Sequence, residues 1–107
     1  MTRRRVLVVE DDAVIRKAMQ KLLERSGYIY AGTGNGTQGL PLAERLHPDV
    51  ILLDIRMPGL YSYEVCRRLK ENPATAAIPV IFLTAVHETS LERLAFDAGA
   101  VACITKP

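Results

Sequence analysis

The feature that most limits the fold of this chain is a regular alternation between short apolar runs and amphipathic stretches. The apolar runs are about five residues long and rich in β-branched side chains. Such runs are typical of strands buried on both faces, as in a parallel sheet. We expect four of these strands and a weaker, more polar edge strand: Arg5–Val9, Asp49–Leu53, Pro79–Leu83 and Val101–Thr105, with Tyr28–Ala31 at the edge.

Helical patterns fill the gaps between these strands. Apolar residues recur every three or four positions within residues 15–23, 40–46, 65–69 and 91–98, and Gly27 and Gly99 are placed to end the first and the last helix. Strands and helices that alternate through short links require parallel pairing with right-handed crossovers. We therefore predict one α/β domain over residues 1–107, with a doubly wound, five-stranded parallel sheet and helices on both faces.

Composition and charge exclude several classes of protein. Hydrophobic residues make up 49% of the chain and charged residues 24%, as in a globular domain. Apolar runs stay far below the roughly 20 residues of a membrane helix, and no secretory signal is recognised, so we expect a cytoplasmic protein without a membrane partner.

The net charge of +2 depends on Arg3, Arg4 and Arg5. Because no aromatic residues alternate with a basic stripe, direct nucleic-acid binding is not expected. Cys66 and Cys103 lack metal-ligand spacing and are interpreted as buried thiols.

Polar residues follow the predicted strands at the point where each strand ends. In a parallel sheet these groups meet at one edge, where ligands bind. The carboxylates of Asp11, Asp12 and Asp54 would repel one another there, and a divalent cation such as Mg²⁺ would relieve that repulsion. A carboxylate can also attack a phosphoryl group to form an acyl phosphate. The groups are Glu10, Asp11 and Asp12 after the first strand, Asp54 after the third, Thr84 after the fourth and Lys106 after the last.

The chain resembles the receiver domains of two-component response regulators. The resemblance covers essentially the whole chain, and the ordered set of motifs is far more specific than any one of them. It implies a flavodoxin-like fold with strand order 2-1-3-4-5. The matching stretches are Val8–Asp12, Asp54–Gly59, Leu83–Ala85, and Ala98–Ala100 running on to Lys106-Pro107.

The resemblance also implies a role for each site residue. Asp54 would be the phosphoacceptor, supplied by a sensor histidine kinase or a phosphotransfer protein. Mg²⁺ would be held by Asp12, Asp54 and the backbone carbonyl of Arg56, with Asp11 acting mainly through water. Thr84 and Lys106 would contact the phosphoryl group, and the Lys106–Pro107 bond would be cis. Such a domain is a signalling module that assists its own phosphorylation and dephosphorylation and switches an output domain or a partner protein; it is not an enzyme with a separate substrate.

The chain departs from the family pattern in three places. Receiver domains usually carry an aromatic residue three positions before the lysine, and its rotamer follows the movement of the threonine; this chain has Cys103 there, and a thiol cannot report the switch as an aromatic ring does. The family often continues its proline–glycine turn with an acidic residue and a glycine, where this chain has Leu60-Tyr61-Ser62. A final helix normally follows the lysine–proline pair. Without it, we expect uncovered apolar surface on one face, in a fragment of a longer chain or in a homodimer.

Other functions remain as alternatives. A degenerate receiver would bind partners independently of phosphorylation, although intact Asp54, Thr84 and Lys106 argue against it. The run Gly34-Asn35-Gly36-Thr37-Gln38-Gly39 matches a dinucleotide-binding motif, but the chain lacks the second half of such a fold. An FMN-binding protein of the same fold is a further alternative. A phosphatase would need a general acid near Asp54, and Arg56 cannot serve because its pKa is too high.

Overall fold

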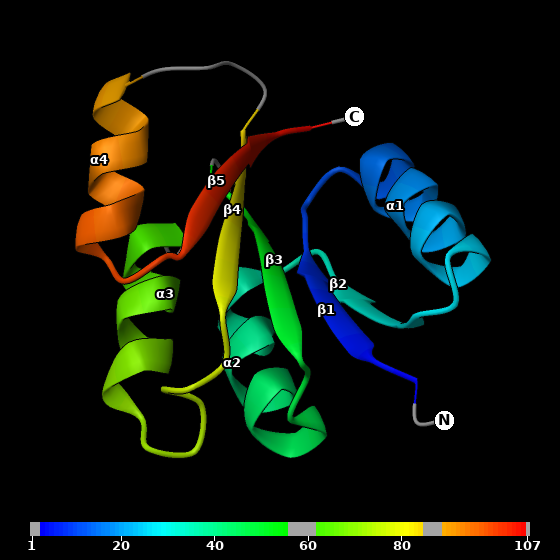
Figure 1. The fold of residues 1–107 in the computed structure, drawn as a ribbon, viewed down its shortest axis with the longest axis horizontal. Coiled ribbons are helices and arrows are strands. Elements are labelled where there is room, and N and C mark those ends of the chain that lie inside the picture. Colours follow the sequence, from blue (N-terminus) through cyan, green and yellow to red (C-terminus); the bar gives the residue numbers. More distant parts are fainter. Residues whose placement is uncertain (1–2, 56–61, 85–88, 107) are drawn as a thin grey trace.

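The computed structural model describes residues 3–55, 62–84 and 89–106. Its strands form one parallel sheet in the order β2-β1-β3-β4-β5, so the predicted fold and strand order are confirmed (Figure 1). The strands are β1 (Arg5–Val9), β2 (Ile29–Thr33), β3 (Val50–Asp54), β4 (Val80–Thr84) and β5 (Ala102–Thr105). The helices are α1 (Ala13–Arg25), α2 (Gly36–Leu46), α3 (Ser62–Glu71) and α4 (Thr89–Asp97).

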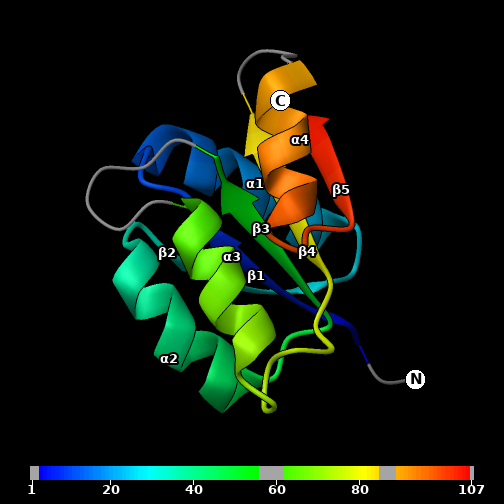
Figure 2. The same ribbon diagram turned by 90° about the vertical axis from the view of Figure 1, so that its left-hand side faces the viewer.

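The helices cover the two faces of the sheet unequally. Figure 2 shows α2, α3 and α4 in front of the sheet, with α1 behind it. Side chains alternate along β1, so Leu7 and Val9 join the larger buried cluster under α2, α3 and α4, while Val6 and Val8 join the smaller one under α1. This period of two, with both faces apolar, is why the strands read as continuous hydrophobic runs in the sequence.

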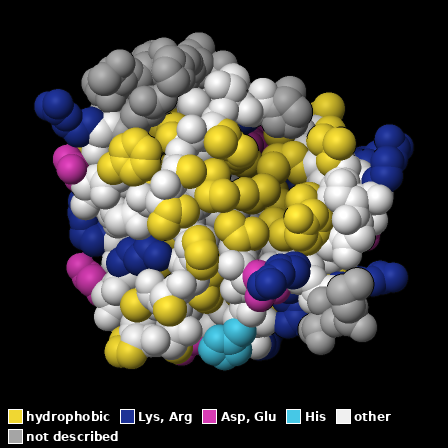
Figure 3. Space-filling model, in the orientation of Figure 1, with side chains coloured by type: hydrophobic (Ala, Val, Ile, Leu, Met, Phe, Trp, Pro, Cys, Tyr) yellow, Lys and Arg dark blue, Asp and Glu magenta, His cyan; other side chains and the backbone are white. Residues whose placement is uncertain are grey.

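The face that carries α1 retains visible apolar surface. Met19 is buried under α1, whereas Val14 is 78% exposed and Leu22 is 53% exposed on the same helix. In Figure 3, hydrophobic side chains gather on this face over the area between α1 and β5. The exposed apolar surface expected from the sequence is therefore present on the α1 side of the sheet.

Two helices end near glycines in the left-handed region of the backbone. Helix α1 ends at Arg25 and is followed by Gly27 with a φ of 92°, and α4 ends at Asp97 before Gly99 with a φ of 108°. Glycine adopts such angles without a Cβ clash, which confirms the predicted helix ends. The described helices reach at most 13 residues, and none of them is both long and apolar enough to pass through a lipid bilayer.

Candidate functional site

Neighbouring strands bring buried polar side chains to the carboxyl edge of the sheet. Val9 lies beside Leu53 in the β1–β3 register. The residues that follow them, Glu10 and Asp54, therefore lie at the carboxyl ends of the two neighbouring strands. Asp54 in turn lies beside Leu83, the residue before Thr84. The exposed fractions of Glu10, Asp54 and Thr84 are 0%, 1% and 2%. Two acidic groups are therefore held almost without solvent contact at one end of the sheet.

Lys106 brings the compensating positive charge from the far end of the chain. Its ammonium nitrogen lies 2.9 Å from Oδ1 of Asp54 and 3.1 Å from Oε2 of Glu10, and the lysine side chain is 14% exposed. The backbone N–H of Lys106 donates to the carbonyl of Thr84 at 2.7 Å, which continues the β4–β5 pairing past the end of β5. The pairing of β5 thus aims the lysine at both acids.

Burial alters the acid–base behaviour of this cluster. Desolvation raises the pKa of Glu10 from 4.5 to about 7, and the charge of Asp54 acts in the same direction. The hydrogen bonds that Glu10 accepts from Lys106 and from the Asp12 amide oppose this rise. Burial alone would lower the pKa of Lys106, but its hydrogen bonds to Asp54 and Glu10 outweigh burial and raise it. The lysine therefore stays charged at neutral pH, while Glu10 is poised to lose or gain a proton there.

Three carboxylates at this edge form a set suited to a divalent cation. Glu10, Asp11 and Asp54 each offer an oxygen atom, and these atoms lie within 4.8 Å of one another. Glu10 and Asp54 are buried, whereas Asp11 is exposed, so the carboxylate group is enclosed by protein on one side and open to solvent on the other. Hard oxygen ligands with access to water are what Mg²⁺ prefers. The donor set therefore fits the metal implied by the sequence.

Asp12 lies in a different environment from the one expected from the sequence. Its carboxylate Oδ1 accepts hydrogen bonds from the backbone N–H groups of Val14 at 2.9 Å and Ile15 at 3.3 Å, as the N-cap of α1. It is exposed, and Glu10 rather than Asp12 joins the carboxylate group. The physical reason is that α1 begins at Ala13, where a capping carboxylate satisfies N–H groups that lack helical partners. The position of Glu10 directly after β1 is the signal that could have identified it.

The other residues expected at the site are placed as follows. Thr84 ends β4 and is buried near the acids. Cys103 lies on β5 beside Phe82, half-buried against the larger core cluster, and is not part of a disulfide. Arg56, expected to offer its carbonyl to the metal, and Pro107, expected to follow a cis bond, lie outside the described residues.

Ser62 is a contact that the sequence reasoning did not anticipate. Its side chain is 1% exposed at the start of α3, and its hydroxyl donates to the backbone carbonyl of Asp54. The first residue of α3 is thereby tied to the last residue of β3. The hydroxyl of Ser62 therefore supplies a side-chain hydrogen bond between the two elements.

Comparison with known proteins agrees with this geometry. The family model described as the response regulator receiver domain matches residues 6–107. The DNA-binding dual master transcriptional regulator RpaA of Synechocystis sp. is 38% identical over 103 residues, which are 96% of this chain and 43% of that protein. The DNA-binding response regulator MtrA of Mycobacterium tuberculosis is 38% identical over 105 residues, or 98% of this chain and 45% of that protein.

A solved structure of another receiver protein has the same fold as this chain. The N-terminal domain of a response regulator receiver protein from Methanoculleus marisnigri superposes with a TM-score of 0.88 at 35% identity, covering 96% of this chain and 84% of that one. The chain spans less than half the length of RpaA and MtrA. The family match over residues 6–107 and the shared fold show that the chain belongs to the receiver domains of two-component response regulators.

Proposed function

We propose that Asp54 is the phosphoacceptor of this receiver domain. The observation that carries the proposal is the ion pair between the Asp54 carboxylate, which is 1% exposed, and Lys106 at 2.9 Å, beside two further carboxylates. A carboxylate oxygen of Asp54 would form a bond to phosphorus while the bond between phosphorus and a histidine nitrogen of the donor breaks. The departing imidazole keeps the electron pair of that bond.

The residues around Asp54 have distinct tasks in this proposal. Lys106 would move its hydrogen bonds to the phosphoryl oxygens, and the Thr84 hydroxyl would donate to another of them. The carboxylates of Glu10, Asp11 and Asp54 would hold Mg²⁺, with the Arg56 carbonyl as a further ligand. Bound Mg²⁺ would supply the positive charge that offsets the charge of the transferred group. Asp12 caps α1 in this scheme and is not a direct ligand.

Thr84 and Cys103 are the residues that we propose would report phosphorylation to the surface. Thr84 ends β4, and Cys103 lies on β5, the edge strand beside it. Movement of the threonine hydroxyl toward a phosphoryl oxygen would change the space next to this edge. The thiol of Cys103 is smaller than the aromatic side chain usual there, so the response would be carried by a shift of β5 and α4 instead of a ring rotation.

The partners follow from the family. The phosphoryl donor would be a sensor histidine kinase or a phosphotransfer protein, and the domain would assist the reaction on itself without converting a separate substrate. Because the relatives RpaA and MtrA are DNA-binding regulators about twice as long, we propose that an attached output domain or a partner protein receives the signal.

Intact mass measurement with a small acyl phosphate and Mg²⁺ tests the proposal. The unmodified chain should gain one phosphate, and Asp54→Asn should gain none. Asp49→Asn is the matched control, since Asp49 lies at the opposite end of the same strand and is 44% exposed. An adduct that persists in Asp54→Asn would reject the assignment. A chain that gains no phosphate but still binds a partner would favour the degenerate receiver.

A further inference from the structure

Arg16 reaches from α1 into the turn that carries the acidic residues. Its Nη1 donates to the backbone carbonyl of Glu10 at 2.7 Å, and this contact is partly buried. The bond spans from the second turn of α1 back to the end of β1. The proposed function gives no task to Arg16, although it is the helix residue that contacts the peptide between Glu10 and Asp11.

The backbone of Glu10 is also held by β2, through the peptide group that precedes this residue. The backbone N–H of Glu10 donates to the carbonyl of Thr33 at 3.0 Å. The N–H and the carbonyl of Glu10 are therefore both bonded, one to the end of β2 and the other to Arg16. The direction in which Glu10 and Asp11 leave the strand depends on both contacts, and only the second is made by a side chain.

Gly34 provides the room that Arg16 occupies. A Cβ atom at Gly34 would lie 2.8 Å from Nη1 of Arg16 and 3.6 Å from the carbonyl oxygen of Glu10. Gly34 is not among the residues with positive φ, so its backbone angles do not require glycine. The first glycine of the motif that resembles a dinucleotide-binding loop thus has a role without any nucleotide, namely space for a guanidinium group.

We propose that Arg16 is a positioning residue for the carboxylate site. Seated against Gly34, its guanidinium holds the Glu10 carbonyl and so fixes the angle at which Glu10 and Asp11 present their carboxylates to Mg²⁺. The inference rests on the proposed function, because it assumes that these carboxylates hold the metal. Hydrogen-bonded groups outside the ligand shell commonly change metal affinity by about 10- to 100-fold.

Charge and geometry predict opposite results for the loss of this side chain. A cation near the acids repels Mg²⁺, so removal of its charge alone would tighten metal binding. Removal of a positioning contact would weaken binding, because the carboxylates would spend more time away from the geometry that the metal requires. The sign of the change in affinity therefore separates the two effects.

Calorimetric titration of the whole chain with Mg²⁺ alone provides the test. We expect Arg16→Met to bind Mg²⁺ about tenfold more weakly, and Arg16→Lys to recover part of the loss by donating one hydrogen bond. Gly34→Ala should also weaken binding, since its methyl group displaces the guanidinium tip. The variant that combines Arg16→Met with Gly34→Ala should bind Mg²⁺ no more weakly than Arg16→Met alone. Lys17→Met, which removes an exposed charge from the adjacent position of α1, should bind as the unmodified chain does.

Amide hydrogen exchange in metal-free protein is the second measurement. Exchange of the Glu10 N–H should become about tenfold faster in Arg16→Met, while the exchange of amides in the middle of β3 stays unchanged. Equal or tighter Mg²⁺ binding by Arg16→Met, or unchanged Glu10 exchange, would overturn the inference. Failure of Asp54 to accept phosphate while Arg16→Met still weakens Mg²⁺ binding would reject the proposed function and leave the positioning role supported.

Discussion

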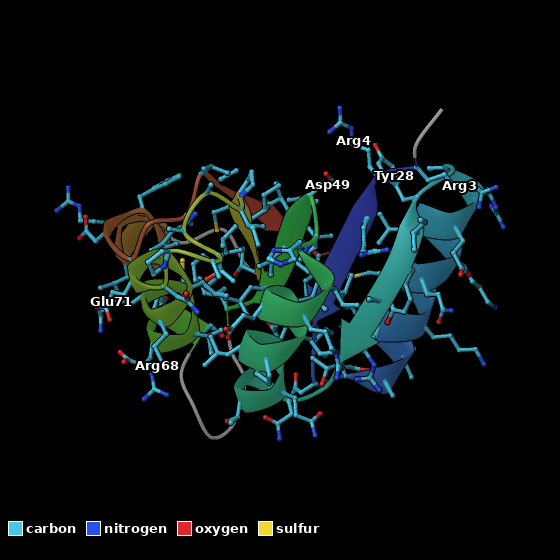
Figure 4. The ribbon with its side chains drawn as sticks, turned by 90° about the horizontal axis from the view of Figure 1, so that it is seen from below. Arg3, Arg4, Tyr28, Asp49, Arg68 and Glu71 are labelled. Carbon is cyan, nitrogen blue, oxygen red and sulfur yellow. The ribbon has the colours of Figure 1, made fainter. Side chains whose placement is uncertain are left out.

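Acid–base pairs lie at both ends of the same sheet, and they differ chiefly in burial. At the carboxyl end, Lys106 contacts Glu10 and Asp54, with exposed fractions of 14%, 0% and 1%. At the amino end, Nη1 of Arg4 lies 3.9 Å from Oδ1 of Asp49, with exposed fractions of 75% and 44% (Figure 4). Water screens the second pair and not the first, so a strong electrostatic effect is expected only at the carboxyl end.

The charged residues at the amino end of the sheet form hydrogen bonds that join neighbouring segments of the chain. Asp49 accepts a hydrogen bond from the backbone N–H of Arg5 at 2.7 Å, and the Arg5 guanidinium donates to the carbonyl of Leu46 at 2.6 Å. These bonds join the start of β1 to the loop between α2 and β3. At the carboxyl end, the acids face one another and a lysine, so part of their charge remains available for a ligand. The comparison teaches that the same residue types join exposed segments at one end and form a buried charged cluster at the other.

The largest expected effect is loss of Lys106 from the buried pair. Lys106→Met should slow phosphorylation of Asp54 by a small acyl phosphate about 100-fold, because a preformed charged donor to the phosphoryl oxygens is removed. The rate is measured by intact mass over time at saturating Mg²⁺. Arg4→Met is the control from the amino end, and its rate should match that of the unmodified chain. Equal rates for Lys106→Met and the unmodified chain would remove the lysine from the mechanism.

The next effect concerns the raised pKa of Glu10. Between pH 4.5 and about 7 the folded chain holds a proton on Glu10 that the unfolded chain releases, so stability falls as pH rises across this window. The contribution is present in full below pH 4.5 and is lost by about pH 7, and it amounts to roughly 3 kcal/mol.

Urea denaturation in the presence of a chelator measures this effect at a series of pH values. Glu10→Gln should lack the decline, whereas Glu44→Gln, an exposed substitution on α2, should retain it. Mg²⁺ affinity of the unmodified chain should rise across the same window, because the metal requires ionised Glu10. Parallel stability profiles for the unmodified chain and Glu10→Gln would show that burial does not shift this carboxyl group.

A smaller effect is expected for the cap of α1. Asp12→Ala should cost about 1 kcal/mol of stability, since two backbone N–H groups lose their acceptor. Its Mg²⁺ affinity should stay within about twofold, whereas Asp11→Asn should bind Mg²⁺ at least about tenfold more weakly. Urea denaturation and calorimetry measure the two quantities. A large loss of Mg²⁺ affinity in Asp12→Ala with little change in Asp11→Asn would show that Asp12, and not Asp11, binds the metal.

The smallest effect is expected at the exposed amino-end pair. Arg4→Met should change stability by less than about 0.5 kcal/mol, because the pair is long and solvated. Urea denaturation at low and high salt provides the measurement, and the two conditions should agree. A loss above about 1 kcal/mol that disappears in high salt would mean that the two ends of the sheet are electrostatically alike.

Much of the fold could be predicted from local patterns. The continuous apolar runs predicted buried parallel strands, and the helix ends followed from Gly27 and Gly99. Strand limits differed by one or two residues: β5 begins at Ala102 instead of Val101, and β2 ends at Thr33 instead of Ala31. Such limits depend on hydrogen bonds between strands, which a single run of residues does not contain.

The sequence by itself determined that acids, a hydroxyl and a lysine would meet at one edge, because parallel strands place their carboxyl ends together. The tertiary structure decided which of these acids lie close together. A shift of two residues separates Glu10, at the end of β1, from Asp12, at the start of α1, and only the packing of both elements shows which carboxylate is buried and which caps a helix. Tertiary structure also decided the contacts of Lys106 with Glu10 and Asp54, because these residues lie at the ends of three different strands that only the sheet brings together.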